Sequence, residues 1–120
     1  MKKRVLKDLL YEQVARIGKA TSSPKRLELL ELLAQEEKSV EVLAAELSIT
    51  IKLASAHLKV LKEARLVTTR KDGKFVYYRL AGPDVGRLWV TLRSVAHEHL
   101  AELRVALDTI SSAPDKLATC

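Results

Sequence analysis

Cysteine and aromatic residues are scarce in this sequence. The 120 residues contain one cysteine, Cys120, at the last position, so no disulfide can form within the chain and a reducing compartment is expected. With one Trp, one Phe and three Tyr, the core must consist mainly of Leu, Val, Ile and Ala. No apolar run reaches the length of a membrane span, and the basic N-terminus lacks a signal peptide's apolar stretch. We therefore expect a cytoplasmic protein without a membrane partner.

Catalytic motifs are missing as well. The sequence has no Gly-rich phosphate loop, no paired-carboxylate site and no complete nucleophilic triad, so an enzyme is not expected. Ser55 and His57 do not form a nucleophile and base pair, because side chains at i and i+2 diverge on a helix.

Positive charge is concentrated in two segments. The formal net charge is +6, and residues 1–26 and 52–79 each hold eight basic and two acidic groups. Residues 27–51 hold one basic and six acidic groups, and residues 80–120 hold four and five. A localised basic surface indicates a polyanionic partner, although a charge run by itself also fits a solvated face.

Hydrophobic spacing predicts four helices in the first half of the chain. The first runs from about Val5 to Ala20 with an apolar stripe. Ser23 and Pro24 cap and begin the second, which ends near Gln35. Ser39 caps a third through Leu47, and after a short break Thr50 caps a fourth, as in a helix-turn-helix. The apolar face of the first helix carries Leu6, Leu10, Val14 and Ile17. In the other three helices, the expected inward residues are Leu27, Leu30, Leu33, Ala34, Val40, Leu43, Ala44, Leu47, Ala54, Leu58 and Leu61.

A basic β-hairpin is predicted after the fourth helix. Residues 67–69 and 75–78 are strand formers, and Asp72-Gly73 is a favoured pair for a two-residue type I′ turn. A helix-turn-helix followed by a basic hairpin is the arrangement of a winged helix-turn-helix. The predicted fold is mainly α with a small β-hairpin.

The fourth helix and the hairpin are the predicted DNA-binding elements. The outer face of the helix is small and basic, which suits the major groove of DNA, while the hairpin cations suit the phosphate backbone. The predicted DNA-binding residues are Lys52, Ser55, Ala56, His57, Lys59, Arg70, Lys71, Lys74 and Arg79.

A last helix is predicted from about Pro83 to Ser111. Its length, roughly 42 Å at 1.5 Å per residue, exceeds what a domain of this size covers by itself. Its apolar stripe and that of the first helix predict a two-fold homodimer. Such a dimer would place two DNA-binding helices, each with its hairpin, on the two half-sites of a palindrome. We therefore expect one domain over residues 1–111 and a flexible tail over residues 112–120.

Four segments resemble the ArsR/SmtB family of winged-helix repressors over about residues 8–110. They are GKATSSPKRLELLELL from Gly18, SVEVLAAELSI from Ser39, SAHLKVLKEARLV from Ser55 and DGKFVYYRL from Asp72. The resemblance implies a homodimeric repressor that leaves its operator when an inducer binds. By position, Ser55, His57 and Leu58 match the family's recognition helix, and Gly73, Tyr77 and Arg79 match its wing.

Three departures from the family pattern matter. Ser39 and Glu41 stand where its soft-metal sensors have Cys-x-Cys, which rules out capture of a soft metal by thiolates within one chain. Arg65 stands where glycine is usual, so it must adopt a positive φ or extend the helix by one residue. Ile51 and Leu53 replace polar residues, and Ile51 could touch a thymine methyl group.

The sensing site is less well defined. His99 and Glu102 fit half of the family's zinc ligand set and Asp84 with His97 fit another half, but neither register is complete, so no metal or other cofactor is expected. His97, His99 and Glu102 stay open as metal candidates, and Cys120 as a thiol sensor across a dimer. A winged helix that binds proteins, without a specific DNA target, is the alternative function.

Overall fold

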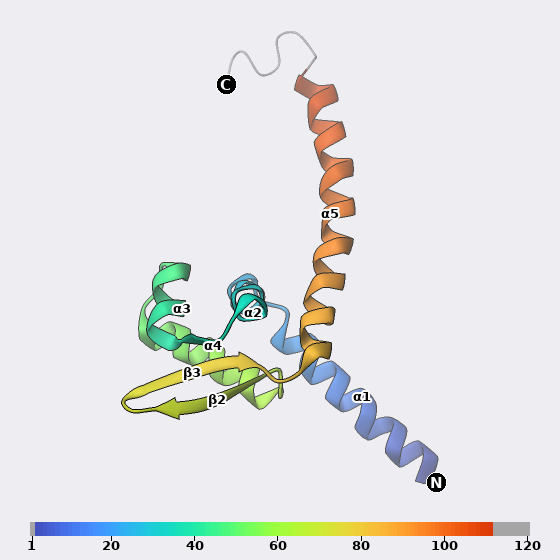
Figure 1. The fold of residues 1–120 in the computed structure, drawn as a ribbon. Coiled ribbons are helices and arrows are strands. Elements are labelled where there is room, and N and C mark those ends of the chain that lie inside the picture. Colours follow the sequence, from blue (N-terminus) through green and yellow to red (C-terminus); the bar gives the residue numbers. More distant parts are fainter. Residues whose placement is uncertain (1, 112–120) are drawn as a thin grey trace. The chain divides into compact units, whose positions relative to one another are not determined.

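Helices dominate the structure, a computed structural model that describes residues 2–111 (Figure 1). Its elements are α1 (Lys2–Ala20), α2 (Pro24–Gln35), β1 (Lys38–Ser39), α3 (Val40–Leu47), α4 (Ile51–Glu63), β2 (Val67–Asp72), β3 (Phe75–Leu80) and α5 (Pro83–Ser111). This is the predicted winged helix-turn-helix. The chain divides into two units, one up to Trp89 and one from Val90. One domain over residues 1–111 stays a prediction, and Cys120 and the tail 112–120 lie outside the described residues.

Three helices begin at the predicted capping residues. The hydroxyl of Ser23 accepts from the backbone N–H of Arg26 at 3.3 Å at the start of α2. Ser39 accepts from the N–H of Val42 at 3.3 Å in α3, and Thr50 from that of Leu53 at 3.1 Å in α4. Each cap satisfies an N–H that the first helical turn leaves unpaired.

Two helices end at a residue with a left-handed backbone. At the end of α4, Arg65 has φ 62°, and the N–H groups of Arg65 and Leu66 donate to the carbonyls of Lys62 and Leu61. This is a Schellman motif, and α3 ends in the same way at Ser48 with φ 55°. Of the two outcomes expected for Arg65, the structure therefore shows the positive φ.

The β-sheet has three antiparallel strands in the order β1-β3-β2, one more than the predicted hairpin. Lys38 pairs with Tyr78 and Ser39 with Tyr77, so the short β1 joins the segment before α3 to the wing. The predicted turn at Asp72-Gly73 was wrong by one residue. Asp72 pairs with Phe75, so the turn is Gly73-Lys74, with positive φ at Gly73 alone of the two. That is the type II′ pattern, whereas type I′ needs positive φ at both central residues.

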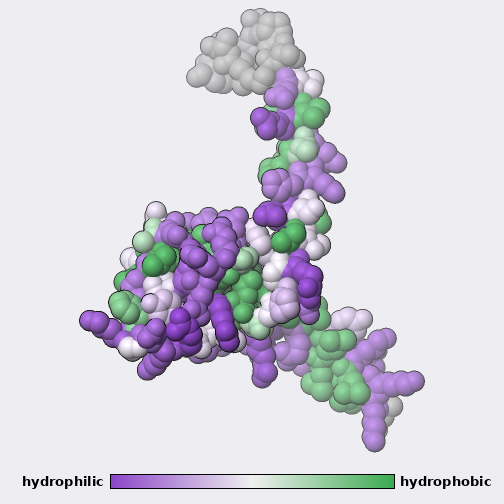
Figure 2. Space-filling view, viewed as in Figure 1, coloured by the Kyte–Doolittle hydropathy of each residue, from purple (hydrophilic) through white to green (hydrophobic). Residues whose placement is uncertain are grey.

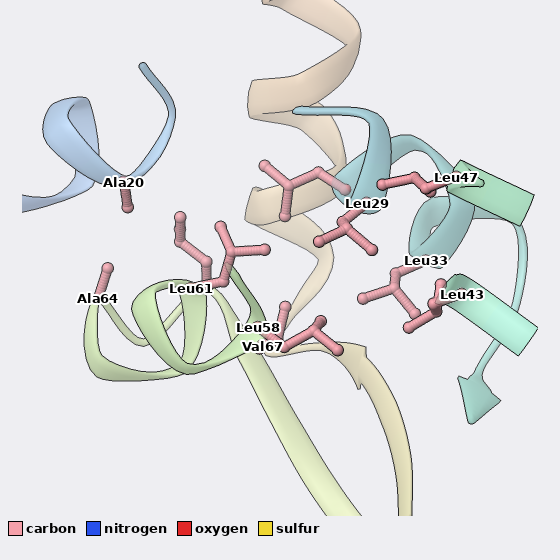
Figure 3. Packing of buried hydrophobic residues seen from close by; sticks show 11 residues of the cluster. Ala20, Leu29, Leu33, Leu43, Leu47, Leu58, Leu61, Ala64 and Val67 are labelled. Atoms are coloured by element: carbon pink, nitrogen blue, oxygen red, sulfur yellow. The ribbon is translucent and has the colours of Figure 1, made fainter. Parts of the chain in front are cut away.

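Leucines from α2, α3 and α4 form most of the core (Figure 3). The largest fully buried side chains are Leu29, Leu30, Leu43, Leu58, Leu61 and Val67. The inward faces predicted for α3 and α4 are confirmed, except that Val40 is only partly buried. The face predicted for α2 was rotated, because Ala34 is exposed and Leu29, which was not predicted, is fully buried.

Exposed apolar side chains mark α1 and the part of α5 after Trp89 (Figure 2). On α1, which begins three residues before the predicted Val5, Leu6 is 67% exposed and Leu10 58% exposed. On α5, Leu103 is 44% exposed and Leu107 60% exposed. Over residues 2–111, none of the helices combines the length and apolar composition that crossing a membrane requires.

Candidate nucleic-acid interface

The outer face of α4 is exposed as its sequence predicts. Ala54, Leu58 and Leu61 are fully buried against the core. The opposite face is exposed and carries Lys52, Ser55, Ala56 and Lys59. Because Ser55 and Ala56 are small, no bulky side chain projects from the helix between the two lysines. Such a surface fits closely into a groove and places ammonium groups at its sides. Contact of these residues with DNA stays a prediction.

Apolar side chains stand on either side of that basic face. Ile51, the first residue of α4, is 50% exposed, and Leu53 is 44% exposed. The first turn of a helix in the major groove is the part that reaches base edges, and a thymine methyl group is the apolar feature there. The exposure of Ile51 leaves the predicted contact with a thymine methyl group sterically open, and that contact stays a prediction.

His57 lies half-buried between α4 and α2, unlike the other residues predicted on the DNA-binding face. Its Nδ1 faces Nη1 of Arg26 at 3.4 Å. Burial lowers the pKa of His57 below its ordinary value of 6.5, and the cations Arg26 and Lys25 lower it further. The imidazole is therefore neutral at pH 7, and it adds no charge to the α4 surface.

Within residues 2–111, three of the four cations predicted on the wing are exposed and form no ion pair with a carboxylate, and two of them lie at its tip. Lys71 at the end of β2 and Lys74 in the turn are exposed. Arg79 on β3 is also exposed, and its Nε lies 3.4 Å from the hydroxyl of Thr68 on the paired strand. These side chains extend from a hairpin with a fixed register, so their spacing is set by the strands.

Arg70 has strong partners inside the chain, which its sequence context did not indicate. Its Nε lies 2.9 Å from both carboxylate oxygens of Glu37, and its Nη2 lies 2.6 Å from Oε1. The guanidinium carbon also stands 4.7 Å from the ring centroid of Tyr77. The hydrogen bond from Arg70 lowers the pKa of the Glu37 carboxyl below its ordinary value. Arg70 thus fixes the wing to the segment before β1, and its predicted contact with DNA is untested.

Lys62 and Arg65 are two further cations between α4 and the wing. The ammonium of Lys62 lies 3.3 Å from the hydroxyl of Thr69 on β2. Both residues line an open groove of about 440 Å³ together with Val67, Thr68, Thr69 and Ala81. The sequence analysis assigned Lys62 no role, although Lys62 and Arg65 both belong to the basic segment 52–79. These two cations therefore lie at the end of α4, next to β2.

The metal candidates lie on the exposed surface of α5. His97, His99 and Glu102 are all exposed. Within the described part of the chain, no group of three or more His, Cys, Asp or Glu side chains is placed to hold a metal ion. The expectation that the protein holds no metal here stays a prediction, with these three residues as the candidates if two chains share a site.

Comparisons with known proteins agree with this fold. Residues 23–69 match the model of a family described as bacterial regulatory protein, arsR family. The HTH-type transcriptional regulator Rv0324 of Mycobacterium tuberculosis is 43% identical over 113 residues, which cover 94% of this chain and 50% of the relative. The chain thus spans half the length of that relative.

One further similar protein is a repressor, and another has a solved structure. The transcriptional repressor SmtB homolog of Synechocystis is 38% identical over 91 residues, covering 76% of this chain and 66% of the relative. The solution structure of the homodimeric winged helix-turn-helix DNA-binding domain Mb0332 (fragment 1–100) of Mycobacterium bovis is 47% identical with a TM-score of 0.75. It covers 78% of this chain and 87% of that one. These relatives bear the names of regulators, in agreement with the expectation that the chain is not an enzyme.

Proposed function

We propose that this chain, which belongs to the arsR family of bacterial regulatory proteins, is a homodimeric transcriptional repressor that binds a palindromic operator and leaves it when an inducer binds. The observation that carries the proposal is the exposed basic face of α4, followed by a basic wing in fixed register. The names of the relatives support the repressor role, and the cytoplasm is the proposed location because bacterial DNA lies there.

In this proposal α4 is the recognition helix and lies in the major groove. Lys52 and Lys59 contact phosphates or guanine edges, and Ile51 meets a thymine methyl group. Lys71, Lys74 and Arg79 on the wing contact the neighbouring backbone. The cations set the affinity and its salt dependence, whereas the apolar residues and Ser55 set the sequence preference.

The proposed dimer uses the apolar faces of α1 and α5. These faces hold side chains that are about half-exposed or more in the single chain, among them Val5, Leu6, Leu10, Val14, Val95, Leu103 and Leu107. Burying them against a second copy removes apolar area from water. The homodimeric state of the Mycobacterium bovis domain supports this assembly. A two-fold dimer presents two recognition helices, which is why the proposed operator is a palindrome with half-sites about one turn apart.

The inducer is proposed to be something other than a soft metal held by a thiol pair at α3. Ser39 occupies the first of the two positions, is 5% exposed and uses its hydroxyl as the N-cap of α3. Glu41 occupies the second position and is exposed in the first turn of α3, where a carboxylate interacts favourably with the helix dipole. Both positions thus serve the stability of α3.

Charge reversal on the proposed DNA-binding surface of α4 and the wing tests the proposal. The variant Lys52→Glu, Lys59→Glu, Lys74→Glu takes the formal net charge from +6 to 0. Fluorescence anisotropy on the DNA upstream of the gene is expected to show loss of specific binding, because three cations become anions on the proposed interface. Sedimentation equilibrium is expected to show an intact dimer.

The control is a variant with the same net charge and an unchanged interface. Arg4→Glu, Arg93→Glu, Arg104→Glu makes the same charge change at exposed positions on α1 and α5, away from the apolar faces of both helices. It is expected to lose only the part of the affinity that depends on total charge. Equal losses in both variants would contradict reading by α4, and wild-type protein that binds scrambled DNA equally well would favour a protein-binding role.

A further inference from the structure

Arg26, on α2, joins two other helices through its guanidinium group. Its Nε donates to the carbonyl of Ala20 at 2.6 Å, and its Nη2 donates to the carbonyl of Lys19 at 3.2 Å. Both acceptors lie at the C-terminal end of α1, where the last carbonyls have no partner within the helix. The remaining nitrogen, Nη1, faces Nδ1 of His57 on α4 at 3.4 Å.

The contact with Arg26 determines the state of the imidazole. A guanidinium group has only donors, so Nδ1 of His57 must be the acceptor and must carry no proton. The proton of the neutral ring then lies on Nε2. The charged groups that act on this ring are Arg26 and Lys25, both cations on α2, and each disfavours a second proton.

We propose that Arg26 is the positioning residue that holds α4 in place relative to the C-terminal end of α1, acting through the imidazole of His57. This inference rests on the proposed function, in which α4 reads DNA. Every nitrogen of the guanidinium faces an acceptor within the chain, and the side chain is only partly exposed. Arg26 therefore contributes to DNA binding through geometry, unlike Lys52 and Lys59, which face outward.

Salt dependence separates a positioning residue from a phosphate contact. Arg26→Gln is expected to weaken binding to upstream DNA about tenfold, the effect of losing one charge-assisted hydrogen bond. The slope of log affinity against log salt should stay that of the wild type, since no phosphate contact is removed. Arg16 and Arg26 both line a groove between the end of α1, the start of α2 and the end of α4. Arg16→Gln is therefore the matched control, because it removes a cation from the same groove and changes the net charge equally.

Two results of this comparison would overturn the inference. A slope reduced by about one would make Arg26 a phosphate contact. Wild-type affinity in Arg26→Gln would show that α4 needs no such tether. Circular dichroism at the assay temperature confirms that each variant is folded before binding is measured.

A pair of substitutions at His57 tests the other end of the link, also where Arg26→Gln does not fold. His57→Asn keeps an acceptor near the position of Nδ1, and His57→Leu removes it. The Asn variant is expected to bind DNA within about threefold of wild type and the Leu variant about tenfold more weakly. Equal losses in both would mean that the ring acts on DNA directly, and no loss in either would remove its role.

Nuclear magnetic resonance of the imidazole nitrogens gives a readout that does not depend on DNA. In the wild type, the His57 ring is expected to be the Nε2–H tautomer, with a pKa below its ordinary value. In Arg26→Gln that pKa should rise, whereas in Arg16→Gln it should not. A proton on Nδ1 in the wild type would overturn the inference, even if the protein binds no specific DNA and the proposed function fails.

Discussion

Leucines in two regions of the molecule have opposite surroundings. In α2, α3 and α4, leucines such as Leu29, Leu43 and Leu58 are 0% exposed. In α1 and the later part of α5, leucines at the same helical spacing are about half-exposed or more, among them Leu6 at 67% and Leu107 at 60%. The first region completes its core within one chain. The second has the sequence pattern of a buried helix, and in the proposed dimer a second chain covers it.

The comparison separates two properties: the stability of α2, α3, α4 and the wing, here called the reading unit, and the assembly of two chains into a dimer. Helices α2 to α4 and the wing can place the basic surface without a partner, since their core is complete. In the proposed dimer, the faces of α1 and α5 decide instead how two such surfaces are spaced. Substitutions in the two regions should therefore have different kinds of effect, which the following predictions use.

The largest effect is expected from a cavity in the core. Leu58→Ala should lower the free energy of unfolding by about 2–5 kcal/mol, because the side chain is fully buried between α4 and the other helices. Leu53→Ala on the same helix is the control, with a change within about 0.5 kcal/mol, as its side chain is 44% exposed. Urea denaturation at one protein concentration measures both. Similar losses would contradict the division between covered and uncovered leucines.

A charge on the α5 stripe should break the dimer and leave the reading unit folded. Leu103→Asp is expected to weaken self-association by about 2 kcal/mol or more, roughly thirtyfold in Kd, since it places a carboxylate in an apolar interface. Ala101→Asp is the control, because position i−2 lies about 200° around the helix. Sedimentation equilibrium gives the result. Wild-type protein that is monomeric at micromolar concentration would refute the proposed dimer.

A smaller gain in stability is expected at the end of α4. Arg65 has φ 62°, a conformation that costs a non-glycine residue about 1–2 kcal/mol. Arg65→Gly should therefore raise the free energy of unfolding by about 1 kcal/mol. Arg65→Ala keeps the strain and removes the charge, so it should show no gain. Thermal unfolding that ranks Gly and Ala equally would show that backbone strain is not the cause.

The smallest effect concerns the tether of the wing at acidic pH. Arg70 lowers the pKa of Glu37 in the folded protein below its ordinary value of 4.5. As pH falls below 4.5, the Glu37 carboxylate therefore takes up a proton more readily in the unfolded state than in the folded state. Stability from this pair is present above pH 4.5 and is lost as pH falls through the lowered folded value. Glu37→Gln should remove that part of the pH dependence. Urea midpoints measured between about pH 3 and pH 6 would show it, and identical profiles would contradict the tether.

Local sequence signals account for most of the fold. Three helices begin at Ser23, Ser39 and Thr50 because each hydroxyl accepts a hydrogen bond from the backbone N–H three residues later. Such capping residues can be recognised from the sequence. The exposed face of α4 followed from helical periodicity. The face of α2 was harder to predict, because five of its twelve residues are leucine and periodicity does not rank them.

Contacts between distant segments were not visible in the sequence. β1 has two residues and no strand pattern, and it exists because β3 supplies partners about 40 positions later. Arg70 pairs with Glu37 across 33 positions, and Arg26 meets His57 across 31. In both cases the sequence shows a cation but not its partner, so a residue that orients the site looks like one that binds DNA.

Anisotropy of wild-type protein on its own upstream DNA and on scrambled DNA, over a range of salt and with and without zinc, tests the central claim most directly. Reading by two α4 helices and two wings predicts tight binding to the upstream DNA, weak binding to the scrambled DNA and a steep salt slope for both. Release by zinc would assign the signal to α5, and retention would direct the search to another inducer. Equal affinity for the two DNA molecules at every salt concentration would contradict the claim that this surface reads an operator.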